Sequence, residues 1–457
     1  MAELSGERTG LGGPEPLLEM VSAQKRGEAR GVVSVCSAHP VVLRAAFDQA
    51  LLDGSSVLVE STSNQVNQEG GYTGARPAEF VTFVSRLAQE AGMPEDLVVL
   101  GGDHLGPNPW TALGVRLAMA RAAEMVRDYV RAGYAKVHLD ASMRCADDPL
   151  GPLADTVAAA RTAELAAAAE AAAVERAPGV PPPVYVIGTE VPPPGGQAGE
   201  REGPALTRVE DAERGLDLTR EAFARRGLGQ AWRRVLAQVV QPGVEFGDEL
   251  VYPYRREAAT GLRSFSESQE RLVFEAHSTD YQAEGALRAL VEDHFAILKV
   301  GPELTFAFRE AVFALEGIER ELLERRAPER LSGLRHVLDR AMSADPRHWK
   351  AYHGDGDEES LRLRRQFSLS DRARYYWPVP EVQQAVRLLF ANLDAERLPR
   401  GLVSQYLPDG VETAIAGPPG GQAARLARLH VRRVLARYSR ACGVAAAEVA
   451  AGAGLPL

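Results

Sequence analysis

Cysteine is scarce in this chain of 457 residues, and its scarcity excludes a disulfide framework. The three cysteines, Cys36, Cys145 and Cys442, form no CxxC pair, which suits a reducing compartment. The sequence also lacks any uninterrupted run of about 18 apolar residues and begins without an apolar signal-peptide core. We therefore expect a cytoplasmic protein with no membrane partner.

An excess of positive charge is also lacking, because 52 Lys and Arg residues face 62 Asp and Glu residues, for a net charge of −10. This balance excludes a general attraction to nucleic acid. Lysine occurs only at positions 25, 136, 299 and 350, which leaves few candidates for lysine chemistry. The overall mixture, 45% hydrophobic and 25% charged, is that of an ordinary folded protein.

Eight short apolar or β-branched segments alternate with amphipathic helical segments, and this alternation is typical of βαβ units. We expect an α/β protein whose strands close into a (β/α)₈ TIM barrel; from the pattern alone, a doubly wound open sheet is the alternative. The predicted strands cover residues 32–36, 56–60, 97–101, 136–140, 184–189, 235–241, 272–276 and 296–300. Between them, helices are predicted over 78–91, 114–132, 156–174, 207–226 and 284–293.

The rest of the chain predicts an appendage to this barrel. Residues 1–12 are expected to be a flexible N-terminus, 13–325 the barrel, and 326–457 a helical C-terminal extension packed on the barrel. A long helix beginning at Pro302 has one apolar face and is expected to pack on the barrel wall.

Polar residues stand where each predicted strand ends, and in such barrels the reactive groups lie at these points. Side chains two residues apart on a strand share a face, so His138 pairs with Asp140, and Glu275 with His277. A polar residue at one strand end has a plain alternative role as a loop cap, but eight together favour a site. The other candidates are Ser37, His39, Asn64, Gln65, Asp103, His104, Ser142, Glu190, Gln241, Glu245, Ser278 and Lys299.

Two histidines in this set suggest a metal centre. His104 and His277, with Gln241, Glu190 or Glu245 as third ligand, would form a divalent-metal site with an open position, which polarises a carbonyl and stabilises an enolate. Asp103 would transfer a proton. For each histidine, a core ring satisfied by backbone groups is the alternative.

A phosphate group has three candidate sites that the sequence does not separate. They are the start of the helix at Gly301, the hydroxyls of Ser278 and Thr279, and the guanidinium groups of Arg372 and Arg374. Nucleotide and nicotinamide sites are disfavoured, because neither GxxxxGK[ST] nor a GxGxxG after a strand occurs. Lys299 is a candidate for a Schiff base, although binding of phosphate or an internal carboxylate is the more ordinary role of such a lysine.

Ten blocks between positions 34 and 408 resemble the family of the non-catalytic subunit of class II tagatose-bisphosphate aldolases. They are SVCSAHP (34–40), ESTSNQVNQEGGYTG (60–74), GGDHLGPNPW (101–110), KVHLDASMRCA (136–146), VIGTEVPPPGG (186–196), VVQPGVEF (239–246), FEAHSTDYQ (274–282), HFAILKVGPELTFA (294–307), SLSDRARYYWP (368–378) and SQYLP (404–408).

The resemblance implies a (β/α)₈ barrel and a role in the breakdown of galactitol, N-acetylgalactosamine or tagatose. Asp103 and His104 resemble the proton-transfer acid and metal histidine of the catalytic relatives, and His277 with Ser278 is similar to their later histidine and phosphate loop. Gln241 stands where those relatives have another zinc histidine. The divalent metal expected at this site is Zn, Mn, Ni or Mg, among which the sequence does not choose.

Two functions remain open. The first is a metal-dependent enzyme that interconverts fructose 6-phosphate and tagatose 6-phosphate at C4 by retro-aldol chemistry. The second is an accessory subunit that stabilises a separate class II tagatose-bisphosphate aldolase; a homo-oligomer is compatible with either, and a kinase role is disfavoured. The hypothesis assigns catalysis to Asp103, Glu190 and Glu245, metal binding to His104, His277 and Gln241, and substrate binding to Ser37, His39, Asn64, Gln65, Asp140, Ser142, Ser278 and Lys299.

Overall fold

The computed structural model describes residues 11–188, 203–412 and 420–444. Most of the N-terminal segment that was predicted to be flexible, 1–12, lies outside these residues, and so does the candidate Glu190. None of the helices in the described ranges is long and apolar enough to cross a membrane.

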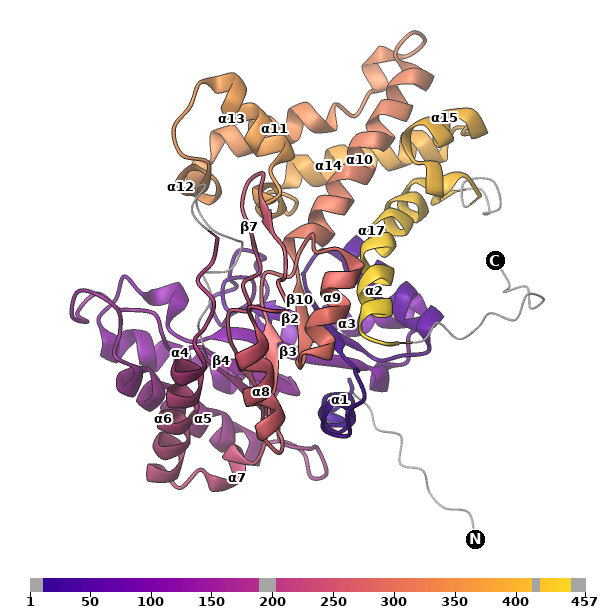
Figure 1. Cartoon of the computed structure of the whole chain (residues 1–457). Helices are drawn as coiled ribbons and strands as arrows, with labels where there is room; N and C mark the ends of the chain where they lie inside the picture. Colours follow the sequence, from indigo (N-terminus) through magenta and orange to yellow (C-terminus); the bar gives the residue numbers. More distant parts are fainter. Residues whose placement is uncertain (1–10, 189–202, 413–419, 445–457) are drawn as a thin grey trace.

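Eight parallel strands close into a barrel, so the predicted TIM-barrel fold is confirmed (Figure 1). The order around the barrel follows the chain, as βαβ units require. The third strand is longer than predicted, because it continues past residue 101 to Leu105. The barrel strands are β1 (Val32–Cys36), β2 (Val57–Thr62), β3 (Val98–Leu105), β4 (Lys136–Leu139), β5 (Val184–Ile187), β6 (Val235–Val239), β9 (Val273–Ala276) and β10 (Phe295–Val300).

Helices cover the outside of the barrel because each has one apolar face. In α4, for example, Ala118, Ala122 and Tyr129 are buried at helical spacing, and the helix ends at Gly133, whose φ of 105° is left-handed. The surrounding helices are α2 (Pro40–Asp53), α3 (Pro77–Ala91), α4 (Val115–Ala132), α5 (Asp155–Val174), α6 (Val209–Arg225), α7 (Gly229–Trp232), α8 (Thr260–Ser268) and α9 (Glu284–Glu292), with short turns η1 (Glu95–Leu97) and η2 (Asn108–Trp110).

The N-terminal end of the barrel is closed by α1 (Glu15–Lys25). Leu17 and Met20 of this helix are buried and pack in one apolar cluster with Leu58, Val99 and Ile297 from inside the barrel. This apolar plug fills the end of the barrel away from the strand carboxyl termini. The polar groups are therefore confined to the other end.

A small antiparallel hairpin, which the sequence did not predict, stands beyond β6. It pairs β7 (Glu245–Phe246) with β8 (Val251–Tyr252), and strands of two residues are too short to show an alternating pattern. The loop between them is tied to the C-terminal region, because Asp248 accepts hydrogen bonds from Ser368 Oγ at 2.6 Å and Ser370 Oγ at 2.8 Å.

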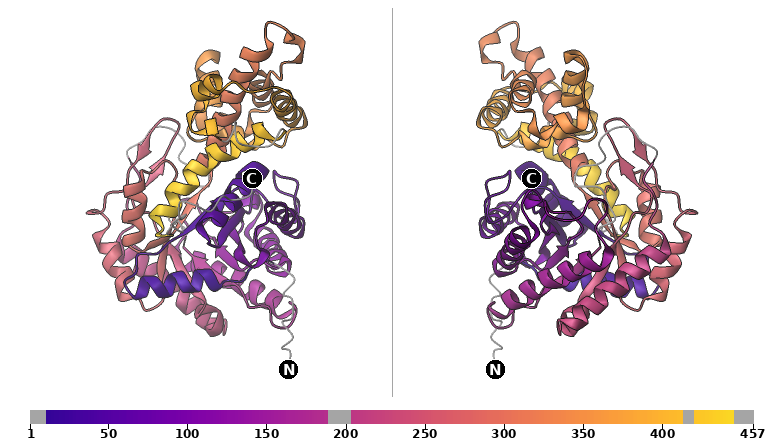
Figure 2. Two further views of the ribbon diagram at one scale, coloured as in Figure 1. Left: turned by 90° about the vertical axis from the view of Figure 1, so that its right-hand side faces the viewer. Right: turned by 90° about the vertical axis from the view of Figure 1, so that its left-hand side faces the viewer.

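The C-terminal extension stands above the carboxyl ends of the strands (Figures 1 and 2). Its first helix, α10, begins at Pro302 as predicted but leads away from the barrel, where it packs with other helices of the extension. The elements are α10 (Pro302–Leu323), η3 (Pro328–Arg330), α11 (Leu334–Ala344), η4 (Pro346–His348), α12 (Lys350–His353), α13 (Glu358–Phe367), η5 (Arg372–Tyr375), α14 (Pro380–Asp394), α15 (Arg400–Tyr406), η6 (Pro408–Gly410) and α17 (Gln422–Ala441).

The last helix, α17, returns to the barrel and packs between α9 and α2. It thus occupies the place of the eighth barrel helix, which α10 leaves open. Tyr438 of α17 is fully buried, its hydroxyl donates to the Thr279 carbonyl at 2.7 Å, and Thr279 Oγ1 in turn donates to the Lys299 carbonyl at 2.6 Å. The predicted division at residue 325 remains a prediction, but α17 shares the barrel's outer layer.

We expect Tyr438→Phe to lower the free energy of unfolding by about 1–2 kcal/mol, because the Thr279 carbonyl loses a buried donor. Arg440→Gln is the matched control on the same helix, since its ion pair with Glu284 is exposed and should be worth less than about 1 kcal/mol. Urea unfolding measures both. Equal losses in the two variants would contradict a structural role for the Tyr438 hydroxyl.

Candidate functional site

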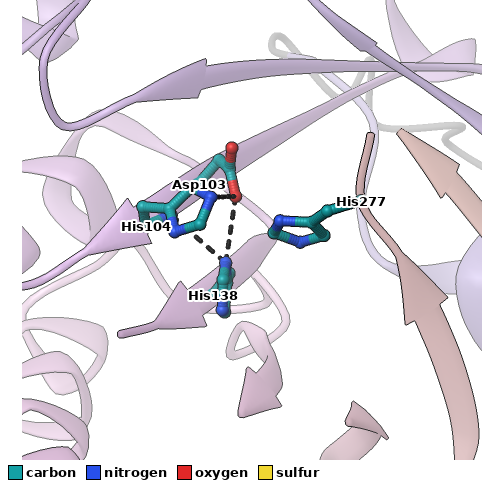
Figure 3. Close-up of side chains that lie close together, drawn as sticks. All are labelled: Asp103, His104, His138 and His277. Carbon is teal, nitrogen blue, oxygen red and sulfur yellow. Dashed lines mark hydrogen bonds and ion pairs between the residues drawn. The ribbon is translucent and has the colours of Figure 1, made fainter. Parts of the chain in front are cut away.

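An irregularity in β3 brings two adjacent residues to the same side. The register against β4 shifts between Gly102 and Leu105, and His104 has a positive φ of 48°. In a regular strand Asp103 and His104 would point to opposite faces, but a bulge redirects side chains. Both therefore point into the carboxyl end of the barrel (Figure 3).

Asp103 and His104 meet two further histidines there, His138 from β4 and His277 from the end of β9 (Figure 3). One ligand atom from each of the four residues lies within 4.8 Å of the others, and all four side chains are buried. We call this set the histidine cluster. His104 and His277 were predicted as metal ligands, whereas His138 was noted only for sharing a face with Asp140.

His104 and His277 each have one nitrogen held by a carboxylate, which leaves the other nitrogen for a ligand. This pattern is typical of metal-binding histidines, whose second nitrogen donates to a carboxylate or carbonyl. Both nitrogens of His138, in contrast, have protein partners, because its Nδ1 lies 2.9 Å from Asp103 Oδ1. The contacts are His104 Nδ1 to Asp140 Oδ2 at 2.7 Å, His277 Nε2 to Glu275 Oε1 at 2.9 Å, and His138 Nε2 to the Gly188 carbonyl at 3.0 Å.

Two buried lysines lie directly beside the cluster, inside the barrel. Lys136 Nζ is 2.6 Å from Glu60 and 2.7 Å from Glu275, and Lys299 Nζ is 2.6 Å from Asp103 and 3.3 Å from Glu60. Although burial opposes ionisation, His104 and Lys299 hold the pKa of Asp103 well below its usual range. The opposite charges likewise raise the pKa of Lys299 well above its usual value despite burial.

The site as a whole carries more negative than positive charge. Four carboxyl groups (Glu60, Asp103, Asp140 and Glu275) face two ammonium groups, those of Lys136 and Lys299. Burial, together with Lys299, lowers the pKa of His277 to about 3, so this ring is neutral. Against the effect of burial, Asp103 and Asp140 raise the pKa of His104. A proton on His104 or a divalent cation on the three rings would offset the excess charge.

Four of the predicted substrate-binding residues line the cavity next to the cluster: Asn64, Gln65, Ser278 and Lys299. Asp140 is engaged with His104, and its other oxygen accepts from Ser142 Oγ at 2.9 Å. Asp140 and Ser142 are therefore placed to orient the ring of His104. Their predicted contact with sugar hydroxyls remains a prediction.

Ser37 and His39 line a neighbouring apolar pocket together with Phe308 and Trp377. Burial lowers the pKa of His39 to about 3, and its ring packs against Phe308 at 4.1 Å. This pocket shares Gln65 and other lining residues with the cavity of the cluster, so the two adjoin.

The third ligand that the sequence favoured, Gln241, has its Oε1 occupied by the Gly243 amide at 2.8 Å, and its Nε2 has no hydrogen-bond partner among the described residues. Gln241 as a metal ligand remains a prediction; His138 is the third ring of the cluster, with Asp103 and the Gly188 carbonyl on its two nitrogens. Glu245, at the start of β7, is buried; its Oε1 accepts from the Phe246 amide, and burial raises its pKa to about 7.

Sequence reasoning missed two features of the cavity. Asp280 Oδ1 accepts from the amides of Gly301 at 3.0 Å and Glu303 at 2.8 Å, so the helix start proposed for phosphate already binds a carboxylate. Tyr375, from the extension, lines the cavity beside Arg374. No local pattern signals either contact, because the partners are far apart in the chain.

The fold and the cluster define a TIM-barrel protein with a buried centre of three histidines and an aspartate at the carboxyl ends of its strands. The chain belongs to the D-tagatose-1,6-bisphosphate aldolase subunit GatZ/KbaZ-like family, whose model matches residues 17–443.

A crystal structure described as a probable tagatose 6 phosphate kinase from Sinorhizobium meliloti 1021 is 44% identical, with a TM-score of 0.81. The match covers 90% of this chain and 100% of that one. The YdjI aldolase from Escherichia coli K12 is 12% identical at a TM-score of 0.41, with 83% and 98% of the two chains covered. Likeness this low adds nothing to the assignment.

Glu245 gives a pH-dependent prediction. Its folded pKa lies above the 4.5 of an exposed glutamate, so between about pH 4.5 and 7 the folded protein keeps a proton that the unfolded chain releases. Stability therefore falls as pH rises through this window. Glu245→Gln cannot ionise and should gain about 2–3 kcal/mol over wild type between pH 5 and pH 8.

Urea unfolding of both proteins at the two pH values measures this change, and the contributions of all other groups cancel in the difference. An equal difference between variant and wild type at pH 5 and pH 8 would show that Glu245 titrates normally.

Proposed function

We propose that this chain is a metal-dependent enzyme for ketohexose phosphates that interconverts fructose 6-phosphate and tagatose 6-phosphate at C4. The observation that carries the proposal is the histidine cluster, in which His104 and His277 are each fixed through one nitrogen and open at the other. Family membership supports a sugar-phosphate substrate. A scaffold alone has no need for a buried centre with excess negative charge.

His104 and His277 would hold the metal, and His138 would complete the three-histidine ligand set of a catalytic zinc site by exchanging the contact of its Nδ1 with Asp103 for the ion. When bound, the metal would polarise the ketose carbonyl and stabilise the enolate that cleavage creates. Asp140, Glu275 and the Gly188 carbonyl would keep the rings oriented.

Asp103 is the proton-transfer group in this proposal, because its carboxylate stays ionised beside Lys299. It would take the proton of the C4 hydroxyl as the C3–C4 bond breaks, which gives a three-carbon aldehyde and a three-carbon enolate. Rotation of the aldehyde exposes its other face. Re-addition forms the C3–C4 bond again, Asp103 returns the proton to the C4 oxygen, and C4 is inverted.

Glu190 and Glu245 remain proposed as further proton-transfer groups. Glu245, with a pKa of about 7, would be able to give or take a proton near neutral pH. Asn64, Gln65 and Ser278 line the same cavity as Asp103 and would bind sugar hydroxyls.

An accessory role is the second candidate, because the family description names a subunit of an aldolase. In that case the chain would bind a separate class II aldolase and have no turnover of its own. A pull-down that recovers such a partner, together with an inactive isolated chain, would favour this role. A kinase is disfavoured, since the sequence contains no GxxxxGK[ST] motif.

The first test is to incubate the purified chain with Zn²⁺, Mn²⁺, Ni²⁺ or Mg²⁺ and fructose 6-phosphate, and to measure tagatose 6-phosphate. We expect product that disappears on chelation. Asp103→Asn should lower kcat by about 10²–10⁴-fold, the usual contribution of a proton-transfer group. No product with any of these metals would remove the self-sufficient enzyme in favour of the accessory subunit.

Metal content tests the centre without turnover. His104→Ala, His138→Ala and His277→Ala should each lose bound metal, and Asp140→Asn should weaken it by about 10–100-fold, because the His104 ring loses its acceptor. His336→Ala, an exposed histidine of the extension, is the matched control. Elemental analysis after dialysis measures the bound metal. Full retention in His138→Ala would show that the third ligand is another residue.

A further inference from the structure

Two arginines of the extension, Arg372 and Arg374, lack a carboxylate partner. No ion pair within 4.0 Å joins either guanidinium to Asp or Glu in the part of the chain that the structure describes, although Arg372 is buried and Arg374 partly buried. Asp371, between Ser370 and Arg372, is engaged elsewhere, with Arg309 at 3.2 Å and Thr305 Oγ1 at 2.6 Å. Burial of an unpaired charge is costly unless a ligand offsets it.

The two terminal nitrogens of the Arg374 guanidinium group are held in place by neutral acceptors. Its Nη1 donates to the Ser370 and Asp371 carbonyls, and its Nη2 donates to the Tyr375 hydroxyl at 3.0 Å. These contacts orient the guanidinium without neutralising it. A preorganised guanidinium without a carboxylate contact is suited to a phosphate or carboxylate.

Aromatic rings fix the surrounding loop. The Tyr375 ring lies 4.5 Å from the Arg374 guanidinium carbon and 4.9 Å from that of Arg372, and His348 stacks on it at 4.6 Å. Tyr72, from the barrel loop after β2, meets Tyr375 edge-on at 4.7 Å. Although burial opposes it, the two guanidinium groups lower the pKa of Tyr375, in keeping with the absence of a carboxylate contact in this corner.

This positive corner belongs to the same cavity as the histidine cluster. Arg374 and Tyr375 line it together with Asp103, His104 and His277. The cavity therefore has a negative end, formed by carboxylates from the barrel strands, and a positive end, formed by the extension. A ligand with a metal-binding oxygen at one end and an anion at the other matches both.

We propose that Arg374, supported by Tyr375 and by the charge of Arg372, binds the phosphate group of the sugar substrate. The identity of the substrate rests on the proposed function, whereas the anion site stands on its own contacts. Two positive charges suit a phosphate monoester, which is a dianion near neutral pH. The other helical site for phosphate, at Gly301, is closed by Asp280.

Calorimetric titration of the full chain with inorganic phosphate tests the site without turnover. We expect saturable binding that weakens at least about tenfold in Arg374→Gln, since a charge-assisted contact to phosphate contributes this much or more. Arg433→Gln is the matched control, because Arg433 is an exposed arginine of the extension paired with Asp409 at 3.0 Å. Unchanged phosphate affinity in Arg374→Gln would overturn the proposal.

If Arg374→Gln does not fold, Arg374→Lys replaces it in the titration. This variant keeps the positive charge and loses only the planar guanidinium group. We expect its phosphate affinity to be lower than that of wild type; affinity equal to wild type would leave the guanidinium group without a role in binding and overturn the assignment.

If the chain turns over fructose 6-phosphate, Arg374→Lys should raise KM with little change in kcat, and free fructose should show no such rise. A fall in kcat alone would place Arg374 in the chemistry and contradict anion binding. If no turnover is found, the titration still decides the anion site, so the two proposals fail separately.

Discussion

The charged network inside the barrel is the constraint on which the rest of the site depends. Lys136 and Lys299 are buried among Glu60, Glu275 and Asp103, and removal of any one partner from such a group leaves an uncompensated buried charge. The five side chains come from β2, β3, β4, β9 and β10, so their pairing fixes how these strands lie relative to one another. Two members of this network also contact the histidine cluster: Asp103 contacts His138, and Glu275 contacts His277.

Backbone strain gathers where the network meets the cavity. His104 and Ser278 both have positive φ values, 48° and 53°, although neither is glycine. Such conformations cost about 1–3 kcal/mol each and persist only where surrounding contacts enforce them. At His104 those contacts are Asp140 and the irregular pairing of β3 with β4. The strain turns the ring toward His138 and His277, and hence serves the geometry of the cluster.

Local patterns predicted the barrel, because each strand and each covering helix shows its own periodicity. They also predicted that polar side chains would meet at the strand ends, including Asp103, His104 and His277. They did not predict that His138 would join the cluster, since that depends on a register shift in β3. They also did not predict that Asp280, 21 positions earlier in the chain, would occupy the helix start at Gly301. Arg374 was one candidate among several until packing placed it in the cavity.

The path of the C-terminal chain bears on the proposed chemistry. The extension is attached to the barrel at both ends, because α10 leaves the barrel at Pro302 and α17 returns to it between α9 and α2. A third attachment lies near its middle, where Ser368 donates to Asp248 of the hairpin loop. It is therefore a fixed wall of the cavity. Cleavage between C3 and C4 frees an aldehyde that carries the phosphate, and this fragment must rotate without leaving. The proposed anchor at Arg374, held at a set distance from the histidine cluster, would meet that requirement because it would retain the phosphate while the aldehyde turns.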